Sequence, residues 1–108
     1  MSFPTDIDAE RLKALMAQGA VTLLDVRNAP ELATGVIAGA RHIPLGELMA
    51  REGELPNELP LVVYCQSGAR SARAAGYLAG TGFGSVYNLR GGILAWTHAG
   101  EPKAPPTL

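Results

Sequence analysis

The sequence predicts an α/β domain with a central, mostly parallel sheet and helices on both faces. Short apolar runs that are typical of buried strands alternate along the chain with stretches that are typical of helices. Repeated strand–helix–strand units favour parallel strands joined by helical crossovers. The chain has 108 residues, of which 47% are hydrophobic and 18% charged, so it suits one folded domain and not a disordered segment.

The first half of the chain contains one clear helix and one clear strand. Asp8 stands where an N-cap is expected, and Ile7 and Leu12 have the spacing of a hydrophobic staple. The helix that follows ends at Gly19, and an apolar strand occupies 21–26. Shorter elements are expected further on: helices over 28–34 and 45–51, a strand over 40–43, and a polar surface loop over 52–60.

The second half begins with an apolar strand over 61–64, and a helix is expected over 71–79. Another strand is expected over 85–88, and Gly91 and Gly92 lead into a last short helix that carries Trp96. We expect one domain over 1–101. The segment 102–108 contains three prolines and is expected to be an extended, mobile tail.

Composition argues against several classes of protein. The net charge of −1 gives no general reason to bind nucleic acid or an anionic membrane. No run approaches the ~20 apolar residues of a membrane span, and the first residues do not resemble a signal peptide, so a cytoplasmic location is expected. One cysteine with His42 and His98 cannot form a disulfide or a metal cage, and no cofactor is expected.

The chain's only cysteine, Cys65, stands at the end of the 61–64 strand. Between the carboxyl end of a strand and the start of a helix, backbone N–H groups converge and the helix dipole favours negative charge. Both effects favour the thiolate, which is the nucleophilic form of cysteine. The nearby Gly68 and Arg70 strengthen this interpretation over the alternative of an inert core cysteine.

A second segment is expected at the same edge of the sheet. Asp25 and Arg27 follow the 21–26 strand, and parallel sheets bind ligands at the carboxyl ends of their strands. We expect Arg27 to pair with Glu31 and to support the loop, although contact of Asp25 or Arg27 with substrate is the alternative. His42 is expected to be a structural residue and not a base.

Four segments together resemble single-domain rhodaneses, and the likeness extends over about residues 6–102. They are LDVR at 24–27 followed by Glu31, GARHIP at 39–44, CQSGAR at 65–70, and NLRGG at 88–92 with Trp96, Gly100 and Pro102 beyond it. Each segment alone is weak, whereas all four in the family's order are specific. One position departs from the family pattern: Val36 stands where a histidine is often found, and we expect a local packing effect from this change.

The resemblance implies a rhodanese-like fold and sulfur transfer. Cys65 would take the outer sulfur of a donor such as thiosulfate as a persulfide and pass it to cyanide, a thiol or a protein acceptor. Arg70 would face the anionic end of the donor. The substrate-binding cradle would consist of Gln66, Ser67, Gly68, Ala69, Arg70 and Ser71.

Two other functions are consistent with this family. Related phosphatases have a loop one residue longer between the cysteine and the arginine, so the spacing from Cys65 to Arg70 disfavours a phosphatase or arsenate reductase. Relatives that serve only as partner-binding modules typically lack the cysteine, so Cys65 disfavours that function too. The sequence does not identify the physiological donor or acceptor.

Overall fold

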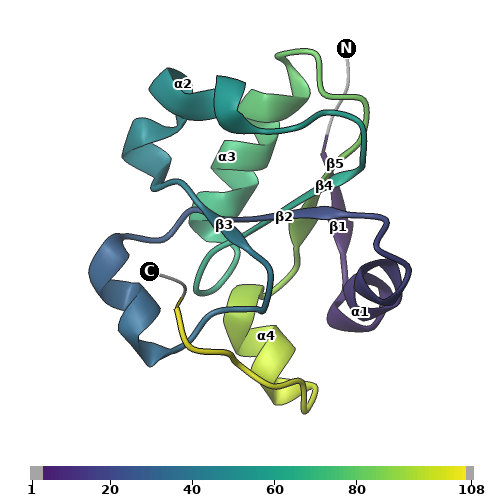
Figure 1. Cartoon of the computed structure of the whole chain (residues 1–108), viewed down its shortest axis with the longest axis vertical. Coiled ribbons are helices and arrows are strands. Elements are labelled where there is room, and N and C mark those ends of the chain that lie inside the picture. Colours follow the sequence, from purple (N-terminus) through teal and green to yellow (C-terminus); the bar gives the residue numbers. More distant parts are fainter. Residues whose placement is uncertain (1–3, 107–108) are drawn as a thin grey trace.

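A computed structural model describes residues 4–106. Within that part of the chain, a five-stranded parallel sheet has the order β1-β5-β4-β2-β3 (Figure 1). The strands are β1 (Thr5–Ile7), β2 (Thr22–Asp25), β3 (Arg41–His42), β4 (Leu61–Tyr64) and β5 (Val86–Leu89). The α-helices are α1 (Ala9–Ala17), α2 (Leu48–Arg51), α3 (Ala69–Ala79) and α4 (Gly92–His98), and 3₁₀ turns occupy Ala29–Thr34, Leu45–Glu47 and Glu52–Glu54. The expected α/β class with helices on both faces is confirmed.

The central strand β4 shows why the sheet has a layer on each face. Its four residues are all buried, and successive side chains point to opposite faces. Leu61 and Val63 pack with residues of α2 and α3, whereas Val62 and Tyr64 pack with residues of α1 and α4. Figure 1 shows α2 and α3 on one side of the sheet and α1 and α4 on the other. A strand buried on both faces requires the continuous apolar run seen in the sequence.

The start of α1 follows the expected pattern. The Asp8 side chain accepts a hydrogen bond from the backbone N–H of Arg11 at 2.8 Å, which satisfies a free donor of the first turn. Ile7 and Leu12 are both buried in the same apolar cluster, as a staple requires. The cap and the staple together fix the angle between β1 and α1.

Three features differ from the expectations. The strand β1 was not expected, because its three residues contain one buried side chain and gain strand structure by pairing with β5. The supposed loop over 52–60 begins with a 3₁₀ turn and buries Leu55. The chain beyond Pro102 is extended but attached, since Ala104 and Val36 exchange backbone hydrogen bonds at 2.8 and 2.7 Å. The last two residues of the expected mobile tail, 107 and 108, lie outside the described part.

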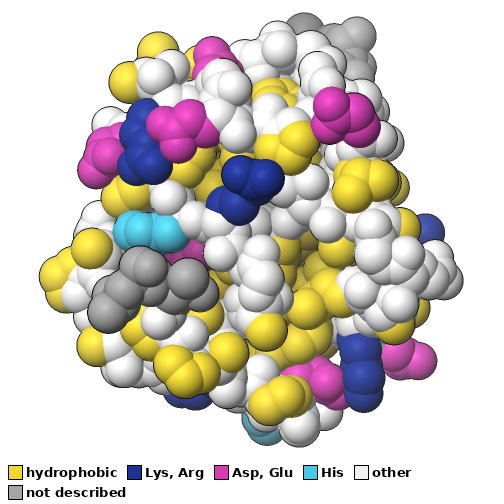
Figure 2. Space-filling view, in the orientation of Figure 1, with side chains coloured by type: hydrophobic (Ala, Val, Ile, Leu, Met, Phe, Trp, Pro, Cys, Tyr) yellow, Lys and Arg dark blue, Asp and Glu magenta, His cyan; other side chains and the backbone are white. Residues whose placement is uncertain are grey.

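The surface and the helices add two observations. On the face shown in Figure 2, Lys and Arg side chains are scattered and do not gather into one basic patch. Among residues 4–106, every helix is too short or too polar to cross a bilayer. Trp96 is almost fully buried over the α1–α4 face and donates its indole N–H to the carbonyl of Pro102 at 2.9 Å, so it covers the core as expected.

Candidate active site

Cys65 lies directly after β4, at the start of the loop that leads into α3. The residue is 1% exposed, and its Sγ accepts hydrogen bonds from the backbone N–H of Gly68 at 3.1 Å and of Ser71 at 3.4 Å. The hydroxyl Oγ of Ser71 lies 3.4 Å from the same sulfur. The six residues 65–70, together with Ser71, curve around the sulfur as a bowl, which we call the cradle. A buried sulfur among such donors is arranged to carry negative charge.

The cradle lowers the pKa of the Cys65 thiol below its ordinary value. Burial raises this pKa, but hydrogen bonds from Ser71 and from the backbone N–H groups of Gly68 and Ser67 lower it by more. The thiolate is therefore available without a neighbouring general base. The side chains of Gln66 and Ser67 and the residue Ala69 are exposed at the outside of the cradle, so these positions contribute mainly through their backbone.

Two glycines give the cradle its shape. Gly68 has φ +104°, in the left-handed region that suits glycine, and a Cβ there would lie 3.3 Å from the backbone N of Gly91. Gly92 passes directly beneath the loop, where a Cβ would lie 2.5 Å from the carbonyl oxygen of Cys65. The sequence indicated a turn at Gly91 and Gly92 but not this close approach.

The start of α4 holds the other side of the loop. The N–H of Ile93 donates to the carbonyl of Cys65 at 2.9 Å, and the N–H of Leu94 donates to the carbonyl of Gln66 at 3.2 Å. Figure 1 shows the loop between β4 and α3 beside this end of α4. Because the two carbonyls point outward to α4, the N–H groups later in the loop are free to point inward to the sulfur.

Arg70 is engaged by an acid at the rim of the cradle. Its Nη1 and Nη2 donate to the two carboxylate oxygens of Glu31 at 2.7 Å each, and both side chains are about one-third exposed. Glu31 also accepts from the N–H of Asn28 at 2.9 Å. The hydrogen bonds from Arg70 lower the pKa of Glu31 to about 2, so the pair is charged at all ordinary pH values.

The expected pairing of Arg27 with Glu31 is wrong. Arg27, which is 0% exposed, donates to both carboxylate oxygens of Asp25, with its Nη2 2.7 Å from Oδ2. It also donates to the carbonyl of Gly35 at 2.9 Å. Its contact with Glu31 is to the backbone carbonyl and not to the carboxylate. Residues two apart in an extended chain lie on one side, so Asp25 is nearer than a partner on the following turn. The Asp25–Arg27 pair therefore ties the end of β2 to Gly35, directly after the 3₁₀ turn, from within the protein.

The His42 side chain is hydrogen-bonded to the backbone of Arg27. Its Nε2 lies 2.7 Å from the carbonyl oxygen of Arg27, and since a carbonyl only accepts, this nitrogen is the donor. His42 thus fixes the backbone after β2, which agrees with its expected structural role.

The sequence did not single out one polar group behind the sulfur. Asn88, on β5, is 7% exposed, and its Oδ1 lies 2.6 Å from the hydroxyl Oγ of Ser71. Its Nδ2 lies 3.3 Å from a carboxylate oxygen of Asp6 on β1. A buried asparagine in a central strand was the available signal, because such a group needs a polar partner.

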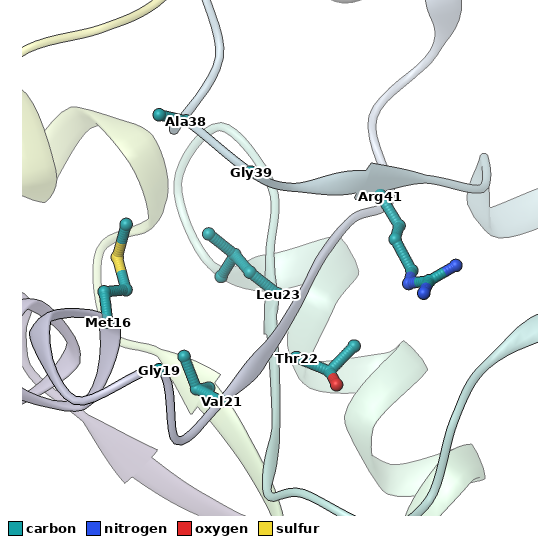
Figure 3. Close-up of a pocket in the computed structure, with 8 residues that line it drawn as sticks. All are labelled: Met16, Gly19, Val21, Thr22, Leu23, Ala38, Gly39 and Arg41. Carbon is teal, nitrogen blue, oxygen red and sulfur yellow. The ribbon is translucent and has the colours of Figure 1, made fainter.

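Two hollows on the surface differ in their distance from the cradle. One, of about 320 Å³ beside β2 (Figure 3), is lined by Met16, Gly19, Val21, Thr22, Leu23, Ala38, Gly39 and Arg41, none of which belongs to the cradle. A second hollow of about 570 Å³ reaches the cradle at Arg70 and extends over Leu45, Leu48 and Met49. Of these two hollows, only the second borders the cradle.

Comparison with known proteins decides the family. The protein-family model of the rhodanese-like domain matches residues 8–99 of this chain. The chain belongs to the rhodanese-like family. The landmark segments of the sequence, including the cysteine loop, all fall within the matched range.

Individual relatives agree with this assignment. The chain is 42% identical to a protein named sulfurtransferase of Allochromatium vinosum, over 94% of this chain and 95% of the relative. It is 38% identical to the thiosulfate sulfurtransferase GlpE of Ectopseudomonas mendocina, over 83% of this chain and 82% of the relative. Among solved structures, a rhodanese-related protein of Thermoplasma volcanium is 34% identical with a TM-score of 0.87, covering 93% of this chain and 97% of the other.

Proposed function

We propose that this rhodanese-like domain is a sulfurtransferase that moves sulfane sulfur from thiosulfate to a thiophilic acceptor through a persulfide on Cys65. The observation that carries the proposal is the cradle itself. The chain's only cysteine lies at its base, with two backbone N–H donors 3.1 and 3.4 Å from the sulfur. The names of the relatives support the same chemistry.

The first half-reaction is a displacement at sulfur. The Cys65 thiolate attacks the outer sulfur of thiosulfate, a new S–S bond forms, and the S–S bond of the donor breaks with its electron pair leaving on sulfite. The persulfide anion then occupies the cradle, where the N–H groups of Gly68 and Ser71 stabilise its charge. Because Cys65 is 1% exposed, the donor must enter with its terminal sulfur first.

The second half-reaction regenerates the enzyme. Cyanide or an acceptor thiolate attacks the outer sulfur of the persulfide, and Cys65 leaves as a thiolate. A low pKa favours this departure, because a more stable thiolate is a better leaving group. The acceptor is a small thiophile, a thiol or a protein thiol, and we place the reaction in the cytoplasm without a role for nucleic acid or membrane.

Arg70 binds the anionic end of thiosulfate in this proposal. The guanidinium is shared with Glu31, so the donor competes with or displaces that carboxylate. A planar guanidinium can donate two parallel hydrogen bonds to sulfonate oxygens as it does to a carboxylate. The pair thus makes Glu31 a modulator of donor affinity.

Steady-state assays of wild type and Cys65→Ser test the proposal. Wild type should form thiocyanate from thiosulfate and cyanide, and Cys65→Ser should fold normally and form none, because a serine hydroxyl is neither ionised nor a good leaving group here. Robust turnover by the serine variant would contradict the covalent scheme. Hydrolysis of a phosphate ester by a wild type that forms no thiocyanate would favour a phosphatase, and inactivity in both assays would favour a binding module.

A further inference from the structure

The Ser71 hydroxyl stands between two acceptors but has one proton. Its Oγ is 2.6 Å from Oδ1 of Asn88 and 3.4 Å from Sγ of Cys65. A separation of 2.6 Å is usual for an O–H···O bond and short for an N–H···O bond, so the amide oxygen is the atom that faces Ser71. The hydroxyl proton therefore lies toward Asn88, and Oγ presents a lone pair to the sulfur.

The orientation of the Asn88 amide is held from its other end. Nδ2 lies 3.3 Å from Oδ1 of Asp6, and an ionised carboxylate can only accept. Asp6 and Asn88 are paired neighbours in the register of β1 with β5. Turning the amide over would place its oxygen against the carboxylate and its nitrogen against Ser71. The chain of contacts from Asp6 through Asn88 and Ser71 to Cys65 is thus directional.

We propose that Asn88 is a positioning residue that keeps the Ser71 hydroxyl proton away from Cys65 and so preserves the basicity of the thiolate. Each hydrogen bond donated to a thiolate stabilises its charge and weakens it as a base. Nucleophilicity at sulfur falls with basicity, with a Brønsted coefficient of about 0.4–0.5. In the resting site the sulfur accepts from the two N–H donors of Gly68 and Ser71, and the Ser71 hydroxyl donates to Asn88 instead.

The charged surroundings do not explain this arrangement. The charged side chains near the cradle include Arg70 with its partner Glu31, Arg73 beside the same hollow, and the Asp25–Arg27 pair at the end of β2. Behind Asn88 stands Asp6, whose carboxylate lies 3.9 Å from Arg90. A change of Asn88 to an apolar residue of similar size leaves all of these charges in place. Any change in the Cys65 pKa that depends on Ser71 must then come from the hydroxyl proton.

The experiment is a double-mutant cycle with Asn88→Leu, Ser71→Ala and the combined variant. The pKa of Cys65 is measured from the ultraviolet absorbance of the thiolate, and its nucleophilicity from the rate of alkylation by iodoacetamide above that pKa. Asn88→Leu releases the hydroxyl to the sulfur, so the pKa should fall by about one unit, as one hydrogen bond to a charged group implies. Alkylation at high pH should slow about threefold.

In the Ser71→Ala background, Asn88→Leu should leave both quantities unchanged. An unchanged or raised pKa in the single Asn88→Leu variant, or an equal shift in both backgrounds, would overturn the proposal. Should Asn88→Leu fail to fold, Asp6→Ala at the exposed end of the chain of contacts frees the amide to turn over. The fall in the Cys65 pKa that Asp6→Ala causes must then be larger in the protein with Ser71 than in the Ser71→Ala variant. Loss of the Asp6 charge alone would change the pKa equally in both proteins.

This inference rests on the proposed function only in taking Cys65 as the nucleophile. Titration and alkylation require no sulfur donor. A protein that shows the expected coupling between Asn88 and Ser71 but never accepts sulfur from thiosulfate would contradict the proposed function alone. A protein that accepts sulfur but shows no coupling between Asn88 and Ser71 would contradict the inference alone.

Discussion

Gly92→Ala tests whether the close contact between α4 and the cysteine loop shapes the active site. Gly92 has φ +63°, and a Cβ there would lie 2.4 Å from the carbonyl oxygen of Gln66 and 2.5 Å from that of Cys65. Both neighbours are backbone atoms, so a rotamer change cannot relieve the overlap. The loop would have to move away from α4, and the hydrogen bond from Ile93 to Cys65 would lengthen.

Gly19→Ala is a matched control for this change. Gly19 has the same φ of +63°, but a Cβ there would meet nothing within 4 Å. Placing alanine in the left-handed region costs about 1–2 kcal/mol at either site. Forcing an extra methyl group into a filled space adds about 1–3 kcal/mol. We therefore expect the free energy of unfolding to fall by about 1–2 kcal/mol in Gly19→Ala and about 2–5 kcal/mol in Gly92→Ala.

Urea denaturation measures the stability of both variants, and the pH dependence of alkylation measures the pKa of Cys65. Gly92→Ala should also raise this pKa, because displacement of the loop weakens the N–H donors of Gly68 and Ser71. Gly19→Ala should leave it unchanged. Equal losses of stability in the two variants, with an unchanged pKa in Gly92→Ala, would refute the role given to the contact with α4.

Four further expected outcomes rest on the geometry of the cradle. Gly68→Val should abolish most activity. Gly82→Val should keep it, because Gly82 has a similar φ (+99° against +104° for Gly68) but lies in open space. Near-normal rates in Gly68→Val would show that the loop is not a tight bowl. Arg70→Ala should lower kcat/KM for thiosulfate by about 5- to 30-fold, mostly through KM, with partial recovery in Arg70→Lys, because a partly exposed charged contact contributes about 1–2 kcal/mol. Glu31→Gln should lower KM instead, because it removes the competing charge and keeps an acceptor for Asn28; a raised KM would show that Glu31 holds Arg70 in its working position. Finally, because the Cys65 pKa is lowered, the rate of sulfur loading should rise with pH with a midpoint below the value of about 8.5 typical of a free thiol. A midpoint at or above that value would contradict the cradle's effect on the thiol.

The elements that follow from strong local patterns could be predicted from the sequence. The four-residue apolar run before Cys65 became β4, and the cap at Asp8 began α1 where expected. The positive φ of Gly68 followed from the need for a tight turn after a strand. These features depend on neighbours in sequence, which periodicity and turn chemistry describe well.

The features that were missed depend on contacts between distant segments. Asp25 was available to Arg27 as a partner two residues away, but Glu31 could be recognised as the partner of Arg70 only once the loop after β4 lay beside the 3₁₀ turn. The strand β1 forms because β5 offers it a paired edge. Asn88 reaches Ser71 because β5 lies next to β4, an order that the sequence alone does not specify.

Intact mass spectrometry shows directly whether Cys65 carries the transferred sulfur. The protein is incubated with thiosulfate, freed of excess donor, and measured before and after addition of cyanide. If Cys65 carries the sulfur, wild type gains the mass of one sulfur atom and cyanide removes it, whereas Cys65→Ser gains none. A wild type that gains no sulfur under conditions in which it forms thiocyanate, or a Cys65→Ser variant that gains it, would show that Cys65 is not the sulfur carrier.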